Sequence, residues 1–182
     1  MAEDSATQGA ETPELPTSPA ELLRRLEELG IPSKTVSHPP VFTVAEAKAL
    51  RGTLPGAHIK NLFLRNKKGA MWLVTCLEDR EIDLKALAGA LEAGRFSFGS
   101  AERLMTYLGV LPGAVTPFAV VNDTEGRVRM VLDRGVVGND PVNCHPLVND
   151  MTTALESKDL IRFLEAVDHA PLILDMDGLV KA

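Results

Sequence analysis

The 182-residue sequence has little cysteine and no long hydrophobic run. Its two cysteines, Cys76 and Cys144, are too few for a disulfide framework, so both are expected to be free thiols. Proline, glycine and threonine interrupt the most apolar stretch, residues 110–121, which falls short of the roughly 18 residues of a membrane span. The first residues are acidic and lack the apolar core of a secretory signal. We therefore expect a cytoplasmic protein without membrane contact.

An excess of positive charge is also missing. The formal net charge of −6 argues against a protein that coats DNA or RNA non-specifically, and we expect no DNA partner. An aromatic content of 4% leaves little for a base-stacking platform. However, Lys60, Arg65, Lys67 and Lys68 lie close together in the sequence, which is compatible with a local contact to a phosphate-bearing end.

The sequence does contain the pattern of one folded domain behind a short tail. Residues 1–17 are small, polar and proline-containing, with four acidic side chains and no basic one, so we predict a disordered acidic tail. Subtracting these four charges from −6 leaves −2 for residues 18–182. Those residues have the length of a single domain, and its first helix begins at the capping box Ser18-Pro19-Ala20-Glu21.

Apolar periodicity and capping residues predict the remaining elements. Helices are expected after Ser18, Thr43, Asp83, Ser100 and Ser157. Strands are expected over residues 58–65, 70–76, 117–122, 127–132, 142–145, 152–155 and 171–174, with a hairpin loop at 66–69. Strands joined mostly by turns, with helices between them, predict an α+β fold with a mixed, largely antiparallel sheet and surrounding helices.

The first candidate for chemistry is a lysine followed by an asparagine on an otherwise apolar strand. On a regular strand Lys60 shares a face with Leu62 and Leu64, whereas Asn61 points to the other side. An edge-strand lysine that extends its ammonium to water also explains the pattern, so both interpretations stay open.

The second candidate is the loop over residues 109–117, which contains two glycines and two prolines. An irregular loop of this kind can direct several backbone N–H groups at one anionic or carbonyl oxygen. It has neither the lysine of a P-loop nor the G-x-G-x-x-G pattern, so nucleotide binding is not indicated. The alternative is an ordinary connection from a helix to a strand.

The third candidate is His145, whose imidazole could act as an acid, a base or a ligand. Cys144 is its sequence neighbour, and on a strand the two side chains face opposite sides, which excludes a thiolate–imidazole pair. The spacing of the four histidines matches no zinc motif, and no G-x-S-x-G nucleophile elbow is present. We expect no metal site.

Three segments in order carry a resemblance to a known family. They are His58-Ile59-Lys60-Asn61-Leu62-Phe63-Leu64, the stretch 108–118 (LGVLPGAVTPF) and His145-Pro146-Leu147-Val148-Asn149, with supporting matches at 82–87 and 96–102. In this order and spacing the sequence resembles the YbaK/prolyl-tRNA-synthetase-associated editing family over roughly residues 33–174. Within that family it most resembles the free-standing Ala-tRNA(Pro) deacylases of the ProX or PrdX branch.

The resemblance implies hydrolysis of the ester that joins a wrong amino acid to the terminal ribose of tRNA. A proline pocket cannot strongly reject the smaller alanine, because missing methylenes are worth only about 1–3 kcal/mol, so a second site must destroy the product. The implied partners are the acceptor end of mischarged tRNA(Pro) and, transiently, prolyl-tRNA synthetase. No metal or cofactor is implied.

The resemblance also implies roles for individual residues. Lys60 would hold the terminal phosphate or ribose, Asn61 would orient the substrate, and Ile59 is a candidate wall of the amino-acid pocket. Backbone N–H groups of the family's G-x-x-x-P loop would polarise the ester carbonyl and position the water; here that loop is Gly113, Ala114, Val115, Thr116 and Pro117. His145 would shape the pocket or order the water, and a ribose hydroxyl of the substrate would assist.

Two alternatives stay open at this point. The same chemistry could act on Cys-tRNA(Pro) or on a Ser-tRNA, because the sequence does not disclose the pocket volume. The same fold could also serve a non-catalytic regulator that binds tRNA or a synthetase, since a fold does not guarantee activity.

Overall fold

The computed structural model describes residues 13–40, 42–51 and 54–182. Most of the predicted tail, residues 1–12, lies outside the described residues. The described end of that tail contacts the domain, because the Thr17 hydroxyl donates to Asn122 Oδ1 at 2.6 Å. Contact with the folded body therefore begins before the first helix.

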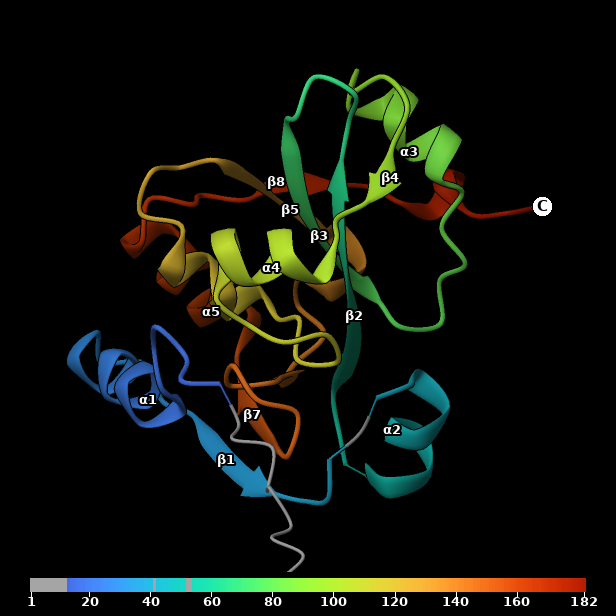
Figure 1. The fold of residues 1–182 in the computed structure, drawn as a ribbon. Coiled ribbons are helices and arrows are strands. Elements are labelled where there is room, and N and C mark those ends of the chain that lie inside the picture. Colours follow the sequence, from blue (N-terminus) through green and yellow to red (C-terminus); the bar gives the residue numbers. More distant parts are fainter. Residues whose placement is uncertain (1–12, 41, 52–53) are drawn as a thin grey trace, which may run out of the picture.

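Within the described residues, eight strands form one sheet in the order β1-β7-β6-β2-β3-β5-β8, with β4 paired to β2 (Figure 1). Their bounds are β1 (Lys34–Ser37), β2 (Ala57–Arg65), β3 (Met71–Leu77), β4 (Ser97–Phe98), β5 (Val128–Asp133), β6 (Val142–Cys144), β7 (Met151–Leu155) and β8 (Leu172–Leu174). Four of the pairings are antiparallel and three are parallel. The predicted α+β fold with a mixed, largely antiparallel sheet is confirmed.

Helices begin where local hydrogen bonds favour them. The bounds are α1 (Pro19–Glu28), α2 (Val44–Arg51), α3 (Leu84–Ala90), α4 (Ala101–Leu108) and α5 (Ser157–Ala166), with short 3₁₀ helices η1 (Pro117–Asn122), η2 (Arg134–Val136) and η3 (Asp177–Leu179). The predicted capping box is present, since Ser18 Oγ accepts from Glu21 N and the Glu21 carboxylate accepts from Ser18 N. Asp83 and Ser100 cap α3 and α4 as predicted. None of the described helices is long and apolar enough to cross a bilayer.

Two local predictions are wrong. The apolar run at 117–122 forms the 3₁₀ helix η1 instead of a strand, because Thr116 Oγ1 accepts from Phe118 N and Pro117 occupies the first position. A short buried apolar run does not distinguish the two conformations by its pattern. Ser157 does not cap α5 but is its first residue, and its hydroxyl accepts from Gly138 N at 2.9 Å instead. Strands β1 and β4 are additions that the sequence pattern did not indicate.

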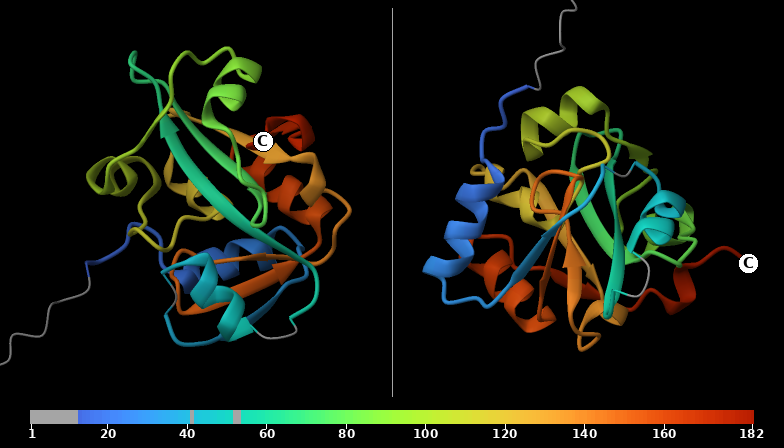
Figure 2. Two further views of the ribbon diagram at one scale, coloured as in Figure 1. Left: turned by 90° about the vertical axis from the view of Figure 1, so that its right-hand side faces the viewer. Right: turned by 90° about the horizontal axis from the view of Figure 1, so that it is seen from below.

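Two hydrophobic clusters cover opposite faces of the central strands. Alternation along β2 places Phe63 in the larger cluster, with α1, α4, η1 and α5, and Leu64 in the smaller one, with α3. Strand β3 is therefore buried over most of its length, whereas β2 is buried only at Ala57, Phe63 and Leu64. Figure 2 shows β2 as a long strand crossing the molecule, and its right panel shows α1 and α2 on opposite sides of the sheet. Any chemistry on β2 must therefore occur where its cover is incomplete.

Candidate functional site

Strand β2 is covered only in part on the edge that faces away from β3. On that edge β6 pairs with the first two residues of β2, and β4 pairs with the last two. No other described strand pairs with the residues between them. The N–H of Gly99 donates to Phe63 O on the β4 side at 2.9 Å, so alternation also directs the backbone groups of Asn61 away from β3. The strand pairing of the sheet is thus interrupted beside Asn61, and we call this interruption the opening.

The Asn61 side chain ties the 113–117 loop to the sheet. Its Nδ2 donates to Val115 O at 3.0 Å, and its Oδ1 accepts from the Thr75 hydroxyl at 2.6 Å. Thr75 is fully buried and lies directly opposite Asn61 on β3. The sequence interpretation assigned Asn61 to the substrate, whereas the contacts of its side chain are to protein groups. Sequence reasoning missed Thr75, whose one signal is a hydroxyl within the apolar run AMWLVTC.

The loop of residues 113–117 is compact and presents backbone N–H groups. Gly113 has a φ of +89°, and a Cβ built there would lie 3.1 Å from the Phe42 ring and 3.4 Å from Asn149 Nδ2. Ala114 N–H donates to Leu111 O at 3.0 Å. Among the described residues, the N–H groups of Gly113 and Val115 have no acceptor. Two donors at one bend can polarise a carbonyl oxygen.

The last two residues of the loop are structural. Thr116 is fully buried, and its hydroxyl accepts the bond that starts η1. Pro117 occupies the first position of η1 and is buried as well. Among the described residues, neither side chain makes a contact that supports its predicted role in substrate binding. Their observed role is to fix where the loop ends.

His145 follows β6 and lies on the same turn as Asn149. Its Nδ1 donates to Met151 O at 2.8 Å, because a carbonyl oxygen can only accept, and this leaves the lone pair on Nε2 of the neutral ring. Burial lowers the pKa of His145, against the opposing effect of the Met151 bond. The ring centroid of His38 lies 6.1 Å away, and His38 Nε2 contacts the Thr152 hydroxyl at 2.8 Å. The result is a neutral imidazole on the segment that carries Asn149, whose Nδ2 lies close to Gly113.

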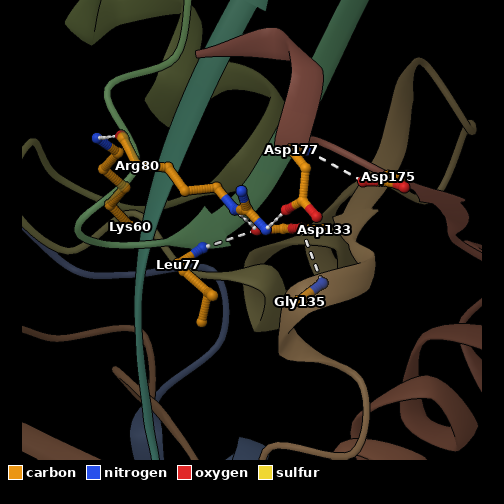
Figure 3. A network of polar contacts seen from close by, with 7 residues as sticks. All are labelled: Lys60, Leu77, Arg80, Asp133, Gly135, Asp175 and Asp177. Carbon is orange, nitrogen blue, oxygen red and sulfur yellow. Dashed lines mark hydrogen bonds and ion pairs between the residues drawn. The ribbon is translucent and has the colours of Figure 1, made fainter.

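Lys60 lies on the opposite face of β2 from Asn61. It shares that face with Leu62 and Leu64, as alternation predicts, while Ile59 packs against the larger cluster on the Asn61 side. The Lys60 ammonium donates to the backbone carbonyl of Arg80 (Figure 3). The structure therefore brings Asn61 and the 113–117 loop into contact and places Lys60 across the strand from them.

Neither cysteine provides a nucleophile. Burial raises the pKa of Cys76 to about 11 and raises the pKa of Cys144 further, so both stay protonated thiols at neutral pH. Both thiols are free and buried, which confirms that prediction. Across the described ranges, no group of three or more His, Cys, Asp or Glu side chains is arranged to hold a metal ion.

With this geometry in place, three comparisons place the chain among known proteins. The sequence model of the family "Aminoacyl-tRNA editing domain" matches residues 38–163. Prolyl-tRNA synthetase associated domain-containing protein 1 of Danio rerio is 39% identical over 166 residues, covering 88% of this chain and 90% of the relative. Prolyl-tRNA editing protein ProX of Acetoanaerobium sticklandii is 37% identical over 146 residues, covering 80% of this chain and 89% of the relative.

A solved structure gives the same fold. It is described as a candidate trans-editing enzyme for prolyl-tRNA synthetase, with a TM-score of 0.65 and 20% identity, over 87% of this chain and 98% of that one. At that identity the likeness supports the fold alone. The sequence relatives and the family match decide the rest: the chain belongs to the aminoacyl-tRNA editing domain family and to its ProX-like, prolyl-tRNA editing group.

Proposed function

We propose that the protein is a trans-editing hydrolase that deacylates tRNA(Pro) mischarged with alanine. The observation that carries the proposal is the 113–117 loop, which Asn61 fixes to β2 at 3.0 Å and in which the N–H groups of Gly113 and Val115 have no acceptor among the described residues. His145 supplies a neutral imidazole on the segment of Asn149, which lies close to Gly113. The printed names of the ProX and synthetase-associated relatives support tRNA(Pro) as the substrate and prolyl-tRNA synthetase as a transient partner.

In the proposed reaction, water attacks the ester carbonyl that joins alanine to the terminal ribose. The N–H groups of Gly113 and Val115 stabilise the negative charge that develops on the carbonyl oxygen. The second ribose hydroxyl of the substrate helps to order the water, and the lone pair on Nε2 of His145 can hold its proton. The bond from the carbonyl carbon to the ribose oxygen breaks, and that oxygen takes up a proton. The products are alanine and tRNA(Pro) with a free terminal hydroxyl.

Lys60 contributes from the other side of the opening. No described strand pairs with the β2 edge between β6 and β4, so a nucleotide across this edge would meet the Asn61 side and the Lys60 side together. An ammonium has three donors, and the Arg80 carbonyl uses one of them. Two donors therefore remain for a phosphate or ribose oxygen.

The test is deacylation of four substrates by the purified protein: Ala-tRNA(Pro), Pro-tRNA(Pro), Cys-tRNA(Pro) and a Ser-tRNA. We expect selective loss of alanine. Selective loss of cysteine or serine would place the protein in another branch of the family. No loss from any substrate would overturn the hydrolase and favour a non-catalytic module that binds tRNA or a synthetase.

Two variants test the site assignment against one control. Lys60→Ala and His145→Ala should lose most deacylation while the fold survives, as judged by circular dichroism and thermal melting. Glu125→Gln removes one carboxylate from an exposed ion pair with Arg127 and should be unchanged. Normal activity in both Lys60→Ala and His145→Ala would remove these two residues from the mechanism.

A further inference from the structure

The carbonyl that holds Lys60 belongs to a residue whose own side chain is strongly fixed. Arg80 Nε donates to Asp133 Oδ2 at 2.6 Å, and Arg80 Nη2 donates to Asp177 Oδ1 at 2.7 Å (Figure 3). The Asp133 side chain is 0% exposed and that of Arg80 is 16% exposed, so this arm of the network is shielded from water. An ion pair with two charge-assisted bonds in such surroundings holds the guanidinium in one geometry.

Asp133 also anchors two backbone segments, the end of β3 that leads to Arg80 and the turn that follows Asp133 itself. It stands at the end of β5 and accepts from Leu77 N at 3.2 Å and from Gly135 N at 2.8 Å. Leu77 is the last residue of β3, so the same carboxylate fixes the start of the loop that carries the Arg80 carbonyl. One buried carboxylate, that of Asp133, therefore fixes both the Arg80 side chain and the main chain that leads to Arg80.

The C-terminal segment, residues 175–181, closes the other end of that loop. Asp83 N donates to Leu179 O and Lys181 N donates to Glu81 O, both at 2.8 Å. Met176 is fully buried in the smaller cluster. The last residues of the described chain thus pair with the loop that supports Lys60.

The space around the guanidinium is also filled. A Cβ built on Gly135 would lie 2.8 Å from Arg80 Nη2 and 2.9 Å from Leu77 Cδ1. A methyl group there must displace the guanidinium without changing any charge. Gly135→Ala is therefore a charge-neutral way to disturb Arg80.

We propose that Arg80 is a positioning residue for Lys60, and that Asp133 and the C-terminal segment hold it in place. A free lysine side chain has much rotamer freedom to lose on binding a phosphate or ribose, and a fixed carbonyl removes part of that loss beforehand. The role of Lys60 in substrate binding rests on the proposed function. The positioning itself is a property of the fold and is tested separately.

The first experiment measures the reactivity of Lys60 without any substrate. The intact protein is treated briefly with an amine-acetylating reagent, and the acetylation of Lys60 is compared by peptide mass mapping with that of exposed Lys67. We expect Lys60 to react several-fold faster in Arg80→Ala and Gly135→Ala, with a smaller increase in Asp177→Asn. Glu125→Gln should match the wild type. Unchanged Lys60 reactivity in folded Arg80→Ala and Gly135→Ala overturns the proposal.

The second experiment is a double-mutant cycle on deacylation kinetics. Arg80→Ala should raise KM about three- to thirty-fold, within the range of coupling energies between neighbouring residues, with a smaller change in kcat, and Arg80→Lys should recover part of it. In the Lys60→Ala background, Arg80→Ala should cause no further loss. Additive losses overturn the proposal, because they show that Arg80 acts independently of Lys60. A wild type that hydrolyses no ester refutes the proposed function instead, while the acetylation result still decides the positioning.

Discussion

Lys60 and Asn61 are neighbours in the sequence, yet opposite kinds of interaction hold their side chains on the two faces of β2. On the Asn61 face, a neutral chain of hydrogen bonds runs from buried Thr75 through Asn61 to Val115. On the Lys60 face, the support is ionic and runs from buried Asp133 through Arg80 to Asp177, whose side chain is 80% exposed. The comparison teaches that the proposed oxyanion donors and the proposed phosphate contact should respond differently to charge, salt and pH.

The largest effect is expected from removing the buried end of the ionic support. Asp133→Ala leaves Arg80 Nε and two backbone N–H groups without their acceptor, so we expect a loss of about 3–5 kcal/mol in the free energy of unfolding. Asp177→Asn, at the exposed end, should cost less than about 1 kcal/mol. Urea unfolding of both variants measures the difference. Equal losses of unfolding free energy in the two variants would contradict an ionic support that is strong at buried Asp133 and weak at exposed Asp177.

The neutral side should give a smaller loss that salt does not change. Thr75→Val removes the hydroxyl that donates to Asn61 Oδ1, with an expected cost of about 1–2 kcal/mol. Thr75→Ser keeps the hydroxyl and is the matched control. Unfolding is measured at low and high ionic strength, because screening acts on charges and not on a buried neutral bond. A salt-dependent cost for Thr75→Val would erase the distinction between the two faces.

Local interactions made much of the fold predictable. Capping residues sit within three positions of their acceptors, so α1, α3 and α4 were predictable, as was the hairpin in which Asn66 Oδ1 accepts from Lys68 N and Ala70 N. The strand prediction for residues 117–122 was wrong because a short run of buried apolar residues has the same sequence pattern in a strand and in a 3₁₀ helix. There tertiary context decided the conformation.

Only the part of the candidate site that belongs to the ordered family motifs could be predicted from the sequence. Resemblance singled out Asn61 and the 113–117 loop, which the fold does bring into contact. The partners that fix the site are remote in sequence: Asp133 lies 53 residues from Arg80, and Asp177 lies 97 residues from it. No periodicity or spacing connects such residues, so Thr75 and the ionic support needed the structure.

The pH response tests His145, on the neutral side of the comparison. Burial lowers its pKa, with His38 acting in the same direction and Asp150 opposing it. Below the ordinary pKa of about 6.5 the unfolded chain therefore binds more protons than the folded one, and stability falls as the pH falls. The contribution is fully present above that pH. His145→Gln should flatten the dependence of unfolding free energy on pH between about 7.5 and 5. An identical slope in the variant would show that other groups cause it.

The smallest effect is expected at the far end of β2, where the hairpin places Lys67 and Lys68. Both are exposed, and neither has an ion pair within the described part of the chain. The hairpin lies about 20 Å along the strand from Lys60, a distance that RNA leading away from the terminal nucleotide can span. Each lysine that contacts a phosphate should contribute about one unit to the slope of log affinity against log salt.

Lys67→Ala/Lys68→Ala should therefore raise KM for the aminoacyl-tRNA about two- to five-fold at low ionic strength and leave kcat unchanged. The difference from wild type should disappear at high salt, whereas the KM defect of Arg80→Ala should remain, because its cause is a misplaced Lys60 side chain in a shielded network. Lys158→Ala removes one exposed lysine that already pairs with Glu156 at 2.8 Å and serves as the control. A salt-independent defect in the hairpin variant would place these lysines in a fixed contact instead of a screened one. Lys67 and Lys68 would then bind substrate in the same fixed way that is proposed for Lys60.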